Sequence, residues 1–264
     1  MRDLLRAIYA YRLFIVSSIK NELHIRFVRS KLGALWIVIH PLMQVLIFAL
    51  ILSEVLSAKL PGINNKYAYA LYLMAGTLCW ALFSETISKC LTLFIDNSNL
   101  LKKMAFPRVC LPLIAAGTAL VNNLMLLVAI LAVFAALGHV PDIQIVWLPI
   151  LILITLMLAM GVGLLLGTLN VFMRDIGQVV PVILQALFWL TPVVYNIDIL
   201  SQGVQRWFRL NPLLPLVTSY QNILVYGKSP LWSELAILVG VSFLLLLFAL
   251  LVFRRASPEM VDVL

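Results

Sequence analysis

Ionisable side chains are scarce within the long apolar stretches of this sequence, which makes Glu85 and Lys89 conspicuous. Residues four positions apart lie on one face of a helix, so these two side chains can form an ion pair. An ionisable group inside an apolar segment is energetically unfavourable and often serves a transported substrate. Lys89 is close enough to the end of its segment for its ammonium to reach the membrane interface. Two interpretations follow, a substrate contact and a structural ion pair, and we favour the structural pair.

The sequence contains no motif of a metal-dependent or nucleophilic enzyme. HExxH and GxSxG are absent. The histidines are scattered at His24, His40 and His139. The cysteines lack metal-site spacing and are interpreted as packing residues, at Cys79, Cys90 and Cys110. Gly227 to Ser229 end like a P-loop, but Asn222 stands where its first glycine would be. We therefore expect a chain that is not an enzyme, holds no metal and does not itself bind ATP.

The composition indicates that these side chains are positioned by membrane-spanning helices. The 264 residues are 63% hydrophobic and 11% charged, whereas soluble domains have about a quarter of their residues charged. One helical crossing of a bilayer needs about 20 apolar residues. We expect one all-α integral membrane domain over 1–264. Its six predicted spans lie near 34–57, 70–95, 111–137, 145–170, 179–199 and 232–253.

The net charge of +8 follows membrane topology rather than a nucleic-acid surface. If both termini are cytoplasmic, 13 of the 19 basic residues lie on the cytoplasmic side and five on the outer side, and Lys89 lies in the second span. The bias of basic residues toward the inner side favours this orientation. We expect a multi-pass protein of a bacterial inner membrane, with both termini cytoplasmic and no nucleic-acid partner.

The segment 1–32 carries an apolar stripe at four-residue spacing, formed by Ile15, Ile19, Leu23 and Phe27. This pattern predicts an amphipathic helix along the membrane surface, in contact with lipids. Arg26 interrupts the stripe, so an ordinary cytoplasmic helix is the alternative.

Between the fifth and sixth predicted spans, "NPLLPLVTSYQNILVYG" is apolar but broken by proline and glycine. Asn211 followed by Pro212 is typical of a helix start, with asparagine as the N-cap. We predict a short external helix that dips back toward the membrane, and the alternative is a loop resting on the interface.

Small and turn-forming residues give three further predictions. Gly163 and Gly167 allow two helices to approach closely. Pro192 is expected to bend the fifth span. Asp175, at the start of "DIGQ", has the spacing of a capping box.

Aromatic residues occur in the first and fifth predicted spans. Aromatic faces can stack on sugar rings, so these side chains suit a channel for a repeating glycan. Interface belts and helix packing are the alternatives for each of them. The candidates are Trp36, Phe48, Phe188, Trp189 and Tyr195.

Four segments, in order, resemble the membrane subunit of ABC-2 type transporters that export polysaccharides such as O-antigen, capsule and teichoic acid. They are "RSKLGALWIVIHPLMQ", "NSNLLKKMAFPR", "GTLNVFMRDIGQVVPVILQALFWLTPVVY" and "LNPLLPLVTSYQNILVYG". The resemblance implies a homodimer paired with two copies of a separate ATP-binding subunit that binds ATP and Mg. It also implies that the first and fifth spans line a channel, and that the substrate is a polysaccharide linked to undecaprenyl diphosphate.

By the same resemblance, "NSNLLKKMAFPR" carries a short cytoplasmic coupling helix that docks on the ATPase. Leu100 and Leu101 can bury in a partner groove while Lys102 and Lys103 meet acidic groups at its rim. The implied contact residues are Ser98, Asn99, Leu100, Leu101, Lys102, Lys103, Met104, Arg174 and Asp175. A plain cytoplasmic interface loop is the alternative for 98–104.

The charged head of such a lipid would meet basic residues at the inner membrane face. The candidates are Arg26, Arg29 and Lys31. Two other functions stay open, an ABC-2 exporter of a small drug or lipid and a stand-alone channel or proton-coupled carrier. The sequence does not indicate which glycan is carried.

Overall fold

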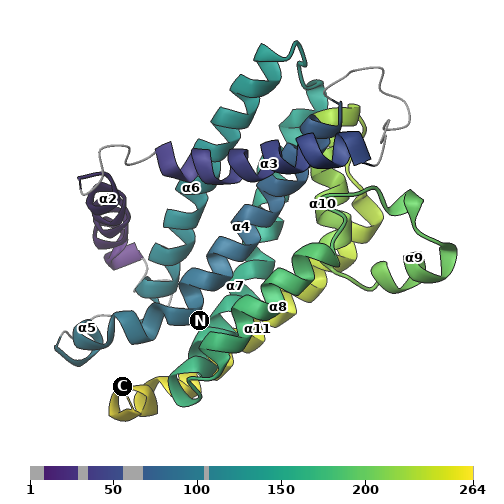
Figure 1. Ribbon diagram of the computed structural model, residues 1–264. Helices are drawn as coiled ribbons and strands as arrows, with labels where there is room; N and C mark the ends of the chain where they lie inside the picture. The colour runs from purple at the N-terminus through teal and green to yellow at the C-terminus, as the bar shows by residue number, and fades with distance from the viewer. Residues whose placement is uncertain (1–8, 29–34, 56–67, 104–106, 264) are drawn as a thin grey trace.

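The computed structural model describes residues 9–28, 35–55, 68–103 and 107–263, and within these ranges the chain is helical without strands (Figure 1). The all-α prediction is therefore confirmed for the described residues. The longer helices are α2 (Arg12–Val28), α3 (Leu35–Val55), α4 (Ala68–Asp96), α6 (Cys110–Ala136), α7 (Leu148–Phe172), α8 (Ile176–Trp189) and α11 (Trp232–Val263). The shorter elements are α5 (Ser98–Lys103), η1 (Ile143–Trp147), η2 (Ile197–Ile199), α9 (Gln202–Phe208), α10 (Leu213–Gln221) and the π-helical turn η3 (Asn222–Tyr226).

Four helical segments in the described residues are long and apolar enough to cross a membrane. They are α4, α6, Ile143–Phe172 and the part of α11 from Trp232 to Met260. These segments match four of the six predicted spans. Helix α8 has 14 residues, fewer than the roughly 20 that a crossing needs, so the count of six stays a prediction.

Helix α8 ends before Pro192, so the predicted span 179–199 is wrong in its second half and Pro192 does not bend a continuous helix. Proline lacks an N–H group and disfavours helical backbone in the residue before it, which is Thr191. The Thr191 hydroxyl donates to the Leu187 carbonyl at 2.8 Å, and the chain then turns. Helix α11, in contrast, continues beyond the predicted end at residue 253 to Val263.

The close packing predicted for Gly163 and Gly167 is confirmed at the contact between α7 and α4. A Cβ atom on Gly163 would lie 2.8 Å from the Cys90 Cβ. A Cβ atom on Gly167 would overlap the Cys90 carbonyl oxygen. Only glycine therefore allows the two backbones to approach this closely. The other face of α7 packs against α11, so α7 lies between α4 and α11 (Figure 1).

Helices α2 and α3 lie outside these helices and pack against α6. Helix α3 runs across α4 and α6 and contacts both (Figure 1). Ile15 of α2 is buried with Cys110 and Ile114 of α6, and Ile19 packs against them. Part of the predicted stripe therefore faces α6, and the membrane-surface position of α2 stays a prediction. Cys79, Cys90 and Cys110 are buried and free, in agreement with a packing role.

The segment after α9 forms α10 and η3, which confirms a helix rather than a loop. The N-cap of α10 is Pro212 rather than the predicted Asn211, but the Asn211 side chain, one residue before that N-cap, still accepts from the Leu213 N–H at 3.0 Å. Its amide donates to Leu190 and Thr191, so it also ties α10 to the end of α8. The capping box at Asp175 is wrong, because the Asp175 side chain makes no capping bond. Its backbone carbonyl accepts from the Gln178 and Val179 N–H groups instead.

Candidate functional site: a polar groove along α4

One face of α4 carries polar and aromatic side chains at four-residue spacing. Trp80, Ser84, Ser88 and Thr92 follow one another along this face, since residues four apart lie above one another on a helix. Trp80 and Ser84 are half-buried, whereas Ser88 and Thr92 are exposed. The helix therefore turns a hydrogen-bonding strip away from the core that it shares with α7.

Three adjoining hollows lie along this strip. A cavity of about 690 Å³ lies between α3, α4 and α6, and one of about 440 Å³ lies between α3, α4 and α8. A third, of about 850 Å³, extends toward α2, α5 and α6. Ser88 lines all three, and Gln44, Trp80 and Ser84 line the first two. We call this continuous depression the α4 groove.

The groove brings together three of the predicted aromatic residues. Trp36 of α3 lines the first cavity and is 54% exposed. Phe188 and Trp189 of α8 line the second. Trp80 of α4 lines both cavities, and its ring centroid lies 5.4 Å from that of Phe188 in an edge-to-face arrangement. Sequence reasoning missed Trp80, although its spacing to Ser84 and Ser88 was visible in the sequence.

The remaining aromatic candidates do not line these cavities in the described part of the chain. The Tyr195 hydroxyl donates to the Trp189 carbonyl at 2.8 Å, and its ring contacts Phe208. Tyr195 therefore supports the turn after α8. The side chain of Phe48 lies outside the described residues.

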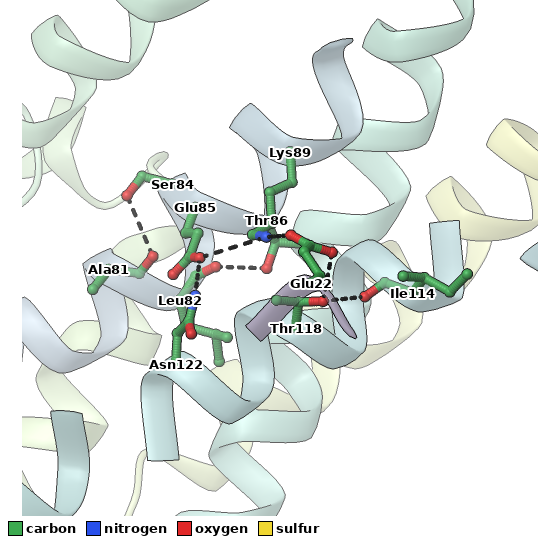
Figure 2. Close-up of polar contacts among 10 residues, drawn as sticks. All are labelled: Glu22, Ala81, Leu82, Ser84, Glu85, Thr86, Lys89, Ile114, Thr118 and Asn122. Carbon is green, nitrogen blue, oxygen red and sulfur yellow. Dashed lines mark hydrogen bonds and ion pairs between the residues drawn. The ribbon is translucent and has the colours of Figure 1, made fainter. Parts of the chain in front are cut away.

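An ion-pair network borders the groove and joins three helices (Figure 2). The Lys89 ammonium lies 2.5 Å from a carboxylate oxygen of Glu22 and 4.0 Å from one of Glu85. The Thr118 hydroxyl donates to Glu22 at 2.9 Å, and the Asn122 amide donates to Glu85. Two carboxylates thus share one ammonium and receive hydrogen bonds from α6. The structural interpretation of Glu85 and Lys89 is supported, but the closer partner of Lys89 is Glu22, 67 positions away in sequence.

The candidate residues for a lipid diphosphate cannot be placed in this groove. Arg26 belongs to α2, but its side chain lies outside the described residues, as do Arg29 and Lys31 entirely. Lys89, the basic side chain that lines the third cavity, is already paired with Glu22.

Helix α5 occupies the predicted position of the coupling segment, with Met104 outside the described residues. Leu101 is only 7% exposed and packs in a cluster with Phe94, Phe253 and Met260. The prediction that Leu101 enters a partner's groove is therefore wrong. Leu100 is half-buried against the same cluster. Leu100 and Leu101 thus both pack toward α4 and α11, where the chain's own core buries them.

The exposed residues of α5 are polar. Asn99 and Lys102 are exposed, and Ser98 is half-buried. The side chain of Lys103 lies outside the described residues. Arg174 and Asp175, in the turn between α7 and α8, are also exposed.

Two contacts fix this end of the molecule. The buried Asn170 amide donates to the Leu91 carbonyl at 2.8 Å and joins α7 to α4. The Arg108 guanidinium donates to the Ser257 hydroxyl at 2.7 Å and joins the loop before α6 to the end of α11. Helix α5 and the C-terminus lie at the same end of the molecule (Figure 1).

The apolar helices that are long enough to cross a membrane define a multi-pass membrane protein, and α4 carries a polar groove. Residues 15–225 match the sequence profile described as ABC-2 type transporter, and the chain belongs to this family. Membership makes the chain a transmembrane transport subunit rather than a catalytic one, and it implies a transport substrate and an ATP-binding partner.

The relatives of the chain cover almost its whole length. It is 30% identical to the O-antigen export system permease protein RfbA of Myxococcus xanthus, over 99% of both chains. It is 26% identical to the protein of the same name from Klebsiella pneumoniae, over 97% of this chain and 96% of the relative. A more distant relative is the polysialic acid transport protein KpsM of Escherichia coli, at 20% identity over 91% of this chain and 92% of the relative.

Proposed function

We propose that this chain is the membrane subunit of an ATP-driven exporter of polysaccharide, and that the α4 groove is part of the polysaccharide path. The observation that carries the proposal is the lining of the groove, in which aromatic rings alternate with hydroxyl and amide groups. The names of the relatives, an O-antigen export permease and a polysialic acid transport protein, point to the same class of substrate.

The chemistry of the groove suits a repeating glycan. Trp36, Trp80 and Trp189 offer ring faces that interact with the C–H face of a sugar without selecting one hydroxyl pattern. Ser88 and Gln44 can exchange hydrogen bonds with successive sugar hydroxyls, and the Ser84 hydroxyl, which donates to the Trp80 carbonyl, can accept one. A lining of many weak and similar contacts lets a polysaccharide bind and advance, because no single position along the groove is a deep free-energy minimum.

A homodimer would close the groove. Helices α3 and α8, which contribute to its lining, expose apolar side chains, which are Met43, Leu46, Ile47, Val179, Val182 and Ile183. A second copy facing these residues would cover them and turn two open grooves into one channel.

We propose that the substrate is a glycan on undecaprenyl diphosphate and that Arg26, Arg29 and Lys31 attract its charged head. Neutralising all three then reduces export without loss of the complex, and unchanged export would refute their role.

The energy comes from a partner in this proposal. Two ATP-binding subunits, which bind ATP and Mg, dock at the end of the molecule that carries α5, on the cytoplasmic side of the bacterial inner membrane. Asn99 and Lys102 form the docking face of α5, together with Arg174 and Asp175 in the next turn. Leu101 anchors α5 to the transporter body, so that movement of the partner is transmitted to α4 and α11.

The proposal is tested in the source cell after deletion of this chain. Surface polysaccharide, measured on gels with a glycan stain, disappears on deletion and returns with the wild-type chain. It does not return when the phosphate-binding lysine of the ATP-binding partner is replaced. Unchanged surface polysaccharide on deletion contradicts the substrate class, and transport that continues without ATP hydrolysis contradicts the ATP-driven mechanism.

The docking face is tested by purification of the chain with its partner. Lys102→Glu reverses the charge of an exposed residue and lowers the amount of ATP-binding subunit that copurifies, with no loss of folded chain. Lys20→Glu, at an exposed position of α2, is the matched control. Equal copurification for both variants would remove α5 from the docking face.

A further inference from the structure

A separate cavity of about 330 Å³ lies beside the first turns of α4, at the end of that helix opposite α5. It is lined by Tyr72, Pro192, Asn196, Ile197, Thr218, Gln221, Asn222, Tyr226 and Lys228. None of these residues lines the three cavities of the α4 groove. Tyr72 precedes Trp80 by eight residues, about 12 Å along a helix, so the cavity lies beyond the Trp80 end of the groove. We call it the Lys228 pocket.

The walls of the Lys228 pocket are fixed by hydrogen bonds from several elements. Gln221 is 2% exposed, and its amide donates to the Pro192 carbonyl at 3.1 Å. The Tyr72 hydroxyl donates to the Tyr195 carbonyl at 3.1 Å. These bonds attach the turn after α8 to both α4 and α10. The pocket is therefore preformed rather than a space between mobile loops.

The backbone after η3 places Lys228 at the pocket. Gly227 has φ of 61°, a left-handed conformation that glycine adopts without strain. This turn lets the Lys228 N–H donate to the Asn222 carbonyl at 3.0 Å. The Lys228 side chain then lies near Tyr226, with its ammonium 5.5 Å from the ring centroid.

The lining offers groups that recognise a sugar. Tyr72 and Tyr226 meet edge to face, with ring centroids 6.4 Å apart, and supply aromatic surface. Thr218 and Asn222 supply a hydroxyl and an amide that exchange hydrogen bonds with sugar hydroxyls. The volume lies at the lower end of the range of about 300–1,000 Å³ for small-ligand sites, which suits a single sugar unit better than a long segment.

The charge of the pocket selects among sugars. Lys228 is exposed, and no aspartate or glutamate is among the described residues that line the pocket, although the Asp142 carboxylate lies next to Gly227. In the described part of the chain no carboxylate forms an ion pair with Lys228. Lys89, which lines the groove, differs from Lys228 because its ammonium is paired with Glu22. An ammonium without a carboxylate partner beside a sugar-sized cavity favours an anionic ligand group.

We propose that the Lys228 pocket binds one sugar unit that carries a carboxylate, with Lys228 paired to the carboxylate and Tyr226 against the ring. The inference rests on the proposed function, because it takes this unit to belong to the exported polysaccharide. In that setting the pocket holds an acidic residue of the glycan as it leaves the groove on the external side.

The test measures binding of two probes to the purified full chain in lipid nanodiscs by ligand-detected NMR titration. The probes are the methyl glycosides of glucuronate and of glucose, which differ in the carboxylate. We expect the glucuronate probe to bind about tenfold tighter, about 1.4 kcal/mol, because its carboxylate can accept a charge-assisted hydrogen bond from Lys228. Lys228→Gln removes this preference and leaves binding of the glucose probe unchanged. Lys228→Arg keeps the preference, and Lys20→Gln, at an exposed position of α2, is the matched control.

Equal binding of the two probes to the wild-type chain would overturn the inference, and so would a preference that survives Lys228→Gln. The failure of this inference is distinct from the failure of the proposed function. If the wild-type chain restores surface polysaccharide but shows no preference for glucuronate, only the pocket inference fails. If it binds glucuronate through Lys228 but restores no polysaccharide, the proposed function fails and the sugar site stands.

Discussion

The two faces of α4 meet different surroundings. On one face, Cys90 packs against Gly163 and Gly167 of α7 so closely that a methyl group at either glycine would overlap α4. On the other face, Trp80, Ser84 and Ser88 line open cavities, and Lys89 reaches across to Glu22 of α2. The first face is held by packing so close that no further atom fits between the two helices. The second face is held by polar contacts that border open cavities. One helix thus provides both the rigid centre of the bundle and the wall of the proposed path.

The closely packed face gives the largest expected effect. Gly167→Leu places a side chain against the backbone of Cys90, which cannot move without displacing α4. We expect about 3 kcal/mol of destabilisation, typical of severe overpacking, and a large loss of folded protein in detergent. The folded yield and the thermal unfolding temperature measure this effect. Gly240→Leu in α11 is the matched control, because nothing lies within 4 Å of a Cβ atom there. Equal yields for the two variants would refute the packing account.

The ion-pair network should give the next largest effect. Lys89→Met leaves two carboxylates beside each other without their ammonium. We expect a cost of about 2 kcal/mol, less than for a fully buried pair, because the Glu22 side chain is 34% exposed. Adding Glu22→Gln should recover part of this cost. A double-mutant cycle on the free energy of unfolding measures the coupling, with Lys20→Met as the control at an exposed position. A coupling energy near zero would show that the ion-pair network does not stabilise the attachment of α2 to α4.

The aromatic lining should affect transport more than stability. Trp80→Ala removes the ring between α3 and α8, and an aromatic contact contributes about 0.5–1.5 kcal/mol beyond its buried area. We expect export to fall by about tenfold with most of the folded yield retained. Surface polysaccharide in the deletion strain measures the effect. Trp207→Ala, at an exposed position of α9 outside the groove, serves as the control. An equal fall in both variants would show that Trp80 has no special place in the path.

The smallest effect is expected at Ser88. Ser88→Ala removes one exposed hydroxyl from a groove with many similar contacts. Stability should change by less than about 0.5 kcal/mol, and export should fall by less than twofold. A large loss of export would mean that Ser88 holds a specific contact, contrary to a path of weak and similar ones.

The difference between the two faces also explains what the sequence could predict. Gly163 and Gly167 are a local signal, since small residues four apart on an apolar helix suffice to predict close packing. The four helical segments that match predicted spans are local in the same sense, because length and hydropathy decide them. The partner of Lys89 was not predictable, because Glu22 lies 67 positions away and only the packing of α2 on α6 brings it close.

Two errors have the same physical origin. The sequence 190–199 is apolar enough to extend a span, yet Pro192 ends the helix and Asn211 fixes the turn from a distant position. Leu101 has the character of a partner contact, yet its own chain offers a core formed with Phe253 and Met260. In both places the pattern of apolar residues was correct, and tertiary contacts decided where those residues were buried.

The central claim, that polysaccharide passes through the α4 groove, is tested most directly by chemical labelling of a cysteine placed at Ser88. The native cysteines Cys79, Cys90 and Cys110 are buried, so a water-soluble thiol reagent should label mainly the new site in Ser88→Cys. Export is arrested with a glycan in transit by an ATP-binding subunit that cannot hydrolyse ATP, and labelling is compared with that of cells unable to make the glycan. The account predicts strong protection of Ser88→Cys by the arrested glycan and no protection of Gln202→Cys at an exposed position of α9. Equal labelling of Ser88→Cys with and without the glycan would contradict it.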